Sequence, residues 1–252
     1  MVEHRVQYGV GITSPPYYSL RDYGVSGQLG LENTVDGYVK ALCNIMDLLY
    51  KVLKKDGLFF LNLGDTYYSG KGASCGIDSK SHKRRFGLRP VDKSGGLGAN
   101  IGRKSIIGIP WRVAIEMISR QWVLRSSIIW YRKNSLPESV KDRPHRSYEY
   151  IFMFAKSRKY YFDRTPLIEK QIDEDVWIIP PRPSGTNLAT APYPDELVAR
   201  CLEIGCIAHG TVLDPFVGSG TTMNVALKNG RNAIGIDISK EFCDYILTHL
   251  EE

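Results

Sequence analysis

Hydrophobic residues recur along this chain with two different periods, which together predict strands joined by helices. Apolar positions three and four apart predict amphipathic helices at residues 35–53, 109–117, 194–204, 221–228 and 240–249. Short apolar runs predict strands at residues 5–12, 58–63, 123–131, 148–155, 211–213 and 232–236. Because strands alternate with helices, we expect an α/β fold with a doubly wound, mostly parallel sheet that is covered on both faces.

Local signals set some of the element ends. Lys54-Lys55-Asp56-Gly57 combines cations with a glycine, which is typical of a helix C-terminus, so the first helix is expected to stop there. Residues 156–162 predict a short basic-aromatic hairpin, and residues 163–192 are rich in proline and are expected to be irregular.

Residues 69–104 show no apolar period and are rich in Gly, Ser, Lys and Arg. They predict a long basic loop insertion. Two interpretations stay open: a solvated insertion, or an arm whose cations bind nucleic-acid phosphates and become ordered on binding. The cations that would make the phosphate contacts are Lys80, Lys83, Arg84, Arg85 and Arg89.

Composition narrows the class of protein. The chain has 252 residues, enough for one α/β domain, and its net charge of +6 favours a polyanionic partner. None of its five cysteines forms a CxxC pair, so reduced thiols and no metal site are expected. No apolar run reaches the length of a membrane span, and we expect an intracellular, cytoplasmic protein.

A glycine-rich segment lies between a predicted strand and a predicted helix, at Asp214-Pro215-Phe216-Val217-Gly218-Ser219-Gly220-Thr221-Thr222. Such glycines let the backbone approach a ligand and leave free N–H groups at the helix start. Asp237 ends the next strand, where an acid can accept hydrogen bonds from both ribose hydroxyls. The third glycine of the dinucleotide motif and the P-loop lysine are missing, so a nucleoside without a pyrophosphate fits better than NAD. A purely structural turn is the alternative.

A proline motif, Thr13-Ser14-Pro15-Pro16-Tyr17, follows the first strand. The prolines fix φ and remove two N–H donors, so the loop is rigid and presents carbonyls. Oxygens that accept hydrogen bonds from the exocyclic amine of cytosine or adenine would favour its pyramidal, nucleophilic form. Taken alone, the motif is equally an ordinary proline turn.

In this order, the two motifs resemble those of the DNA amino-methyltransferases of the β arrangement, in which the catalytic motif precedes the AdoMet motif. Residues 57–65, 109–112, 128–134 and 191–197 match the family as well. The resemblance implies a single methyltransferase domain over residues 1–252, with a Rossmann-like sheet and a circularly permuted motif order. It also implies S-adenosyl-L-methionine (AdoMet) as the cofactor and double-stranded DNA as the partner.

The resemblance assigns roles to residues of both motifs. Ser14 and the Pro15 carbonyl would bind the target amino group and the adjacent ring nitrogen, and Pro16 completes the rigid loop. Tyr17 would stack on the base after it flips out of the duplex. Methyl transfer would be direct, without a covalent intermediate. The AdoMet site would be formed by Asp214, Phe216, Gly218, Ser219, Gly220, Thr221, Thr222 and Asp237, and closed by Ala191 to Pro194.

Ser14 makes the motif most similar to that of the N4-cytosine enzymes, because N6-adenine enzymes usually carry Asp there. We therefore expect a site-specific N4-cytosine methyltransferase. N6-adenine methylation, RNA methylation and a non-catalytic DNA-binding relative stay open. Residues 133–190 are the expected place of target recognition but are few, so residues 69–104 are expected to share it. A homodimer and a cognate restriction endonuclease are the further partners that the resemblance implies.

Overall fold

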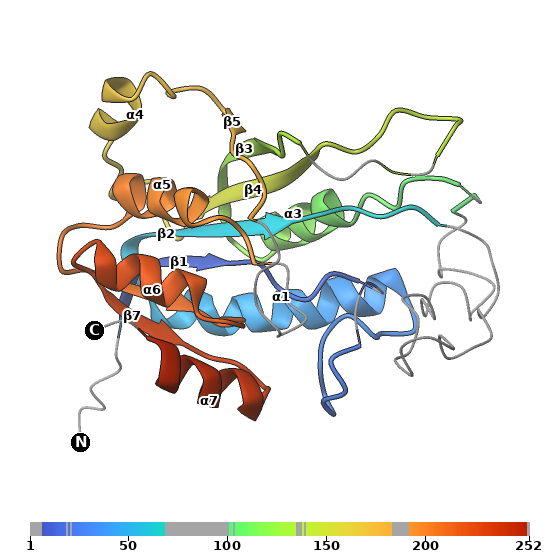
Figure 1. Cartoon of the computed structure of the whole chain (residues 1–252), viewed down its shortest axis with the longest axis horizontal. Helices are drawn as coiled ribbons and strands as arrows, with labels where there is room; N and C mark the ends of the chain where they lie inside the picture. The colour runs from blue at the N-terminus through green and yellow to red at the C-terminus, as the bar shows by residue number, and fades with distance from the viewer. Residues whose placement is uncertain are drawn as a thin grey trace. The chain divides into compact units, whose positions relative to one another are not determined.

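The computed structural model describes residues 7–18, 20, 22–68, 101–102, 104–134, 138, 140–182 and 192–250. Within them the strands form one sheet in the order β5-β3-β4-β2-β1-β6-β7 (Figure 1). β1 pairs in parallel with β2 and β6, and β6 with β7. β3 is antiparallel to β4 and parallel to β5, so the predicted, mostly parallel sheet is confirmed. The strands are β1 (Tyr8–Thr13), β2 (Leu53–Leu63), β3 (Val123–Tyr131), β4 (Tyr148–Ala155), β5 (Val176–Ile178), β6 (Thr211–Asp214) and β7 (Asn232–Gly235).

The chain is divided into two compact units. Unit 1 consists of Met1–Ser14, Leu49–Asn62 and Gln121–Glu252, and unit 2 of Pro15–Leu48 and Leu63–Arg120. Unit 1 contains the sheet together with α4 (Thr165–Glu169), α5 (Asp195–Gly205), α6 (Thr221–Lys228) and α7 (Lys240–His249). Unit 2 contains α3 (Ile109–Ser119) and most of α1 (Val35–Val52).

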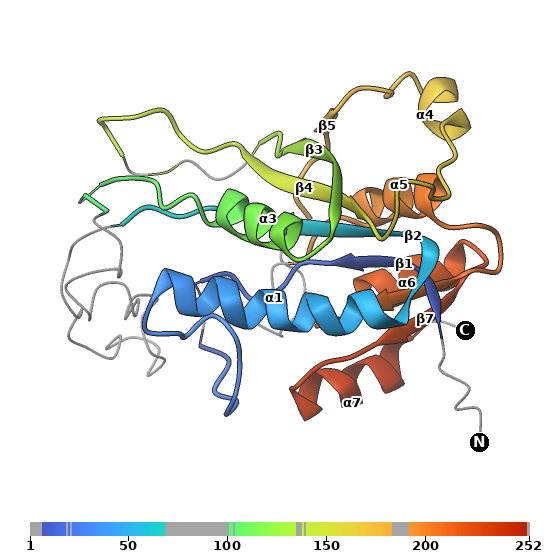
Figure 2. The same ribbon diagram turned by 180° about the vertical axis from the view of Figure 1, so that it is seen from behind.

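The core of unit 1 lies between the sheet and the helices α5 and α6, which lie side by side on one face of it (Figures 1 and 2). Apolar side chains of β1, β2 and β6 pack there against Leu197, Cys201 and Val225. The helix comes very close to the strand at Gly205, because a Cβ there would lie 2.8 Å from Phe60 Cε2. A glycine is therefore required for this contact between α5 and β2.

In unit 2, α1 and α3 run side by side (Figure 2). The Cys43 thiol lies 3.9 Å from the Val113 carbonyl, and the Arg120 guanidinium bridges Asp47 and Glu116 at 2.9 and 2.8 Å. The Asp65 carboxylate accepts hydrogen bonds from the N–H groups of Gly108 and Ile109 and so caps the start of α3.

The first helix ends within one residue of its expected end, but residues 54–57 belong to β2 and do not form the expected helix stop. The helix stops at Val52 and β2 begins at Leu53, opposite Tyr8 of β1. Gly57 is not a helix stop: a Cβ there would lie 2.7 Å from the Gly9 carbonyl oxygen, so the residue permits close passage of the two strands. Pairing with β1 overrides the local signal of the lysines and the glycine.

Two further expectations are corrected. Residues 163–192 are not wholly irregular, because they contain α4 and the edge strand β5, which pairs with β3 from Ile129 to Tyr131. Residues 156–159 form bends and residues 160–162 have no regular structure, so the expected hairpin is not formed; the N–H of Tyr161 bonds to the Asp56 carbonyl at 2.8 Å. The basic cluster of residues 80–89 lies outside the described residues. Among the described helices, none is both long and apolar enough to cross a membrane.

Candidate active site

The two sequence motifs meet at the C-terminal edge of the sheet. β1 and β6 are neighbours in parallel register, with Gly11 opposite Leu213. Thr13 and Asp214 therefore both stand at the carboxyl ends of their strands. The chain leaves β1 for β2 on one side and returns through β6 on the other, so this is a switch point of the sheet. Open α/β sheets bind ligands outside the strands at such a point.

A buried hydrogen-bond network joins these strand ends. The Thr13 hydroxyl donates to Asp214 Oδ1 at 2.5 Å, and the N–H of Phe216 donates to the same oxygen at 3.0 Å. The hydroxyls of Tyr193 and Thr222 donate to Oδ2 at 2.9 and 2.5 Å, so both of their protons are directed to the carboxylate, and the two hydroxyl oxygens lie in close contact with each other. Asp214 is 1% exposed. The network fixes the end of β1, the entry to α5 and the first turn of α6 relative to one another.

The electrostatics of the network follow from its burial. Burial raises the pKa of the Asp214 carboxyl above its ordinary value, and the hydrogen bonds from Thr13 and its other donors oppose that rise. Burial also raises the pKa of Tyr193 well above its ordinary value, so its hydroxyl stays protonated and remains a donor. A carboxylate offers about four acceptor positions, and Asp214 receives four protein donors. Its lone pairs are therefore occupied within the protein.

The glycine turn leads from β6 into α6 in a conformation suited to glycine. Gly218 and Gly220 have φ angles of 52° and 88°. A Cβ on Gly220 would lie 3.1 Å from Ile246 Cγ1 of α7, so space also favours glycine there. In the part of the chain that the structure describes, no side chain caps α6 at Gly220. Its first-turn N–H groups can therefore bind the carboxylate of a ligand.

Asp237 connects the end of β7 to the glycine turn. Its carboxylate accepts hydrogen bonds from the N–H groups of Gly218 at 2.9 Å and Ser239 at 2.8 Å. Two acceptor positions are left on this half-buried side chain for hydroxyl donors of a ligand. The residues that the sequence predicted for a nucleoside are thus placed at one edge of unit 1. This combination of uncapped helix, glycines and acid fits a nucleoside that carries a carboxylate.

The proline loop passes from unit 1 into unit 2 between Ser14 and Pro15. Within unit 2, the Pro16 carbonyl accepts a hydrogen bond from the hydroxyl of the buried Tyr38 at 2.9 Å. Gly30 supports the loop from another side, because a Cβ there would lie 3.0 Å from the Tyr17 carbonyl oxygen. Ser14, Pro16 and Tyr17 are half-buried. The loop is thus fixed by its own prolines and by contacts from α1 and the segment before it.

Sequence reasoning did not single out three of these residues. Thr13 belongs to the proline motif and Tyr193 to the range 191–194 expected to close the cofactor site, but neither pattern predicts a hydrogen bond to Asp214. Tyr38 lies in the apolar stripe of α1, which signals burial but not the partner of its hydroxyl. Pro194, which was predicted to border the cofactor, is the residue before α5 and adjoins Tyr193. Ala191 lies outside the described residues.

A doubly wound sheet with a glycine turn before one helix and an acid at the end of the next strand is the arrangement of Rossmann-like folds that bind nucleosides, and the AdoMet-dependent methyltransferases share it. Residues 10–248 match the model of a DNA methylase family, and the chain belongs to this N6/N4 DNA methylase family. The class that the sequence motifs implied is thereby confirmed.

Curated relatives share much of the sequence. The chain is 39% identical over 240 residues to the Type II methyltransferase M.SmaI of Serratia marcescens, which covers 92% of this chain and 80% of the relative. It is 38% identical over 247 residues to the Type II methyltransferase M.Cfr9I of Citrobacter freundii, covering 95% and 80%.

Solved structures share the fold. The cytosine-N4-specific PvuII DNA methyltransferase has a TM-score of 0.73 at 19% identity, with 98% of this chain and 81% of that one covered. M1.HpyAVI in complex with SAM has a TM-score of 0.60 at 17% identity, with 98% and 90% covered. At these identities the likeness shows a common Rossmann-like methyltransferase fold.

Proposed function

We propose that this DNA methyltransferase transfers the methyl group of AdoMet to the N4 amino group of cytosine in double-stranded DNA. The observation that carries the proposal is Ser14, which follows Thr13 directly at the end of β1. Thr13 is hydrogen-bonded to Asp214 of the glycine-turn segment. The motif that would hold the base is therefore tied through its first residue to the segment that would hold the cofactor. The cytosine-N4 specificity of the PvuII enzyme is consistent with this choice.

The chemistry needs acceptors for the amino group and a partner for the adjacent ring nitrogen. The Ser14 hydroxyl both donates and accepts, whereas an ionised aspartate only accepts. Ser14 would donate to the cytosine ring nitrogen while the Pro15 carbonyl accepts from the amine. When bound, AdoMet supplies an electrophilic methyl group. The contribution of the protein is then to hold the amine in line with that group and to keep water out.

The cofactor roles are proposed from the same edge of unit 1. Asp237 would accept hydrogen bonds from the ribose, and the uncapped first turn of α6, with Thr221 and Thr222, would bind the carboxylate. Asp214 would act by shaping the turn, because its acceptor positions are filled by protein donors. Phe216, Ser219 and Pro194 would border the ligand.

Product identification tests the proposal. Purified protein is incubated with AdoMet and unmethylated DNA, and the DNA is digested to nucleosides for mass spectrometry. N4-methylcytosine is the expected product. N6-methyladenine alone would move the enzyme to the adenine branch of the family, and methylation of RNA in preference to DNA would overturn the substrate. No methylated nucleoside, with AdoMet binding also absent, would indicate a non-catalytic DNA-binding relative.

A further inference from the structure

A basic and aromatic cleft in unit 1 has no role in the proposed reaction. It has a volume of about 550 Å³ and lies between the start of β3 and the segment that follows β4. Its walls combine three cations with two aromatic rings and one aliphatic side chain, which are Val123, Arg125, Arg158, Lys159, Tyr160 and Phe162.

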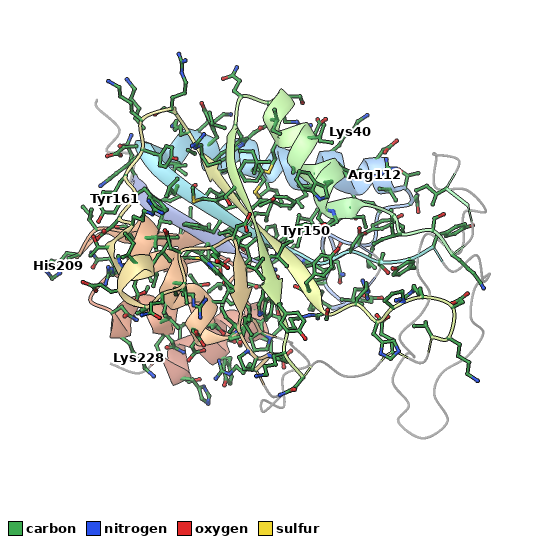
Figure 3. The ribbon with its side chains drawn as sticks, turned by 90° about the horizontal axis from the view of Figure 1, so that it is seen from above. Lys40, Arg112, Tyr150, Tyr161, His209 and Lys228 are labelled. Carbon is green, nitrogen blue, oxygen red and sulfur yellow. The ribbon has the colours of Figure 1, made fainter. Side chains whose placement is uncertain are left out.

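The cleft lies at the end of the sheet opposite the candidate active site. The segment after β4 bonds to the start of β2, where the N–H of Tyr161 meets the Asp56 carbonyl at 2.8 Å (Figure 3). Thr13 pairs with Leu61 of the same strand. The five residue-to-residue steps from 56 to 61 span roughly 16 Å at about 3.3 Å per residue. A ligand in the cleft is therefore distinct from a base at Ser14.

The cations of the cleft are not neutralised by the part of the chain that the structure describes. Arg125, Arg158 and Lys159 form no ion pair there, whereas Arg120 and Arg132 each bond to a carboxylate at 2.9 Å or closer. The Arg125 guanidinium is held in place, because Nε donates to the Tyr160 hydroxyl at 2.7 Å. Cations gathered in this way repel one another, and an anionic ligand would relieve that repulsion.

The aromatic rings define the rest of the ligand. Phe162 is 38% exposed and Tyr160 is half-buried beside it. Cations that face the backbone together with rings on which bases stack are the features of sites for single-stranded nucleic acid. We propose that the cleft binds a nucleic-acid strand, with phosphates at Arg158 and Lys159 and a base against Phe162, separately from the DNA in the active site.

Binding of a short labelled strand tests the proposal. The probe is a 5′-phosphorylated, fluorescein-labelled hexathymidylate, which offers the active site no cytosine or adenine. Anisotropy is measured with the full-length protein between about 50 and 200 mM salt. The variant R158S/K159S is compared with the control K40S/K228S, which removes two exposed cations from α1 and α6 (Figure 3).

We expect R158S/K159S to weaken binding at least tenfold at the lower salt and to reduce the salt slope by about 1.4, because each lost phosphate contact on a single strand contributes about 0.7. The control should bind as the wild type does, and Phe162→Ala should weaken binding at least fivefold. A thermal unfolding midpoint equal to that of the wild type in every variant reports correct folding.

Three results would overturn the proposal. One is unchanged affinity in R158S/K159S. Another is equal competition by polyglutamate, which would indicate a general polyanion surface. The third is full displacement by thymidine 5′-monophosphate at matched nucleotide concentration, which would assign the cleft to free nucleotides. A loss of methylation activity in the wild type would bear on the proposed function and not on this site.

Discussion

Replacing Thr13 with valine removes one hydroxyl while nearly preserving the shape of the side chain. The lost donor is the one that bonds to Asp214 Oδ1 at 2.5 Å, in a region where Thr13 is 0% exposed. Water does not reach that oxygen easily, so only the N–H of Phe216 still serves it. A hydrogen bond to a charged group contributes about 1.5–3 kcal/mol, so the free energy of unfolding should fall by about 2 kcal/mol.

The stability lost in Thr13→Val should depend on pH, in a direction set by the pKa of Asp214. Burial already raises the pKa of Asp214, and removal of a donor raises it further. A raised carboxyl pKa gives stability that is present at low pH and is lost as the pH rises through the folded-state value. The difference in stability between wild type and Thr13→Val should therefore be small in acid and grow as the pH rises.

Activity should fall along with stability, because Thr13 positions the adjacent Ser14. A displacement of about 1 Å in a catalytic group can cost a hundredfold in rate, so kcat is expected to fall more than the KM for AdoMet rises. Urea unfolding across pH and radiolabelled methyl transfer measure the two effects. Thr13→Ser keeps the hydroxyl and should restore both. Thr13→Val that unfolds and turns over like the wild type at neutral pH would show that this hydrogen bond contributes neither stability nor positioning.

Three other changes test separate parts of the site. Asp237→Ala removes the proposed ribose acceptor and a hydrogen-bond partner of the Gly218 N–H. Calorimetry should show AdoMet affinity reduced about 30-fold, equivalent to about 2 kcal/mol. Unchanged affinity would contradict the role of Asp237. Tyr38→Phe removes the hydrogen-bond donor to the Pro16 carbonyl. It should lower kcat and the free energy of unfolding, the latter by about 1 kcal/mol, while AdoMet affinity is unchanged. Weaker AdoMet binding with a normal kcat would contradict a role of Tyr38 in fixing the proline loop. Serine at the five cations of the basic segment should weaken duplex binding and reduce the salt slope by up to about 0.9 per contact, whereas equal binding would remove the segment from the DNA interface. Those cations are Lys80, Lys83, Arg84, Arg85 and Arg89.

The sequence predicted the elements whose signal is local. The spacing of apolar residues was sufficient to predict α1, because a helix with one buried face repeats apolar positions with the helical period. Short apolar runs were sufficient to predict the parallel strands. The start of β2 was wrong, since the pairing of Leu53 with Tyr8 is a long-range contact that overrides the local signal of Gly57. The three-residue strand β5 was missed for the same reason, as it exists only through its pairing with β3.

In the candidate site, too, the local motifs were predicted and the long-range contacts were not. Motif order placed the proline loop and the glycine turn in one family. It did not predict that Thr13 bonds to Asp214, because these residues are 201 positions apart. Tyr193 lies in a stretch that matches the family, but no sequence pattern indicated that its hydroxyl donates a hydrogen bond to the Asp214 carboxylate. Side-chain partners of buried hydroxyls depend on tertiary packing, which periodicity does not encode.

The most direct test of the central claim follows one methyl group. Wild type and Ser14→Ala are each incubated with AdoMet that carries a deuterated methyl group and with unmethylated duplex DNA, and the digested nucleosides are identified by mass. We predict label on N4 of cytosine in the wild type and a large loss of that product in Ser14→Ala, with the protein still folded and binding AdoMet. Label found only on N6 of adenine, or cytosine labelling unaffected by the loss of the Ser14 hydroxyl, would contradict the account.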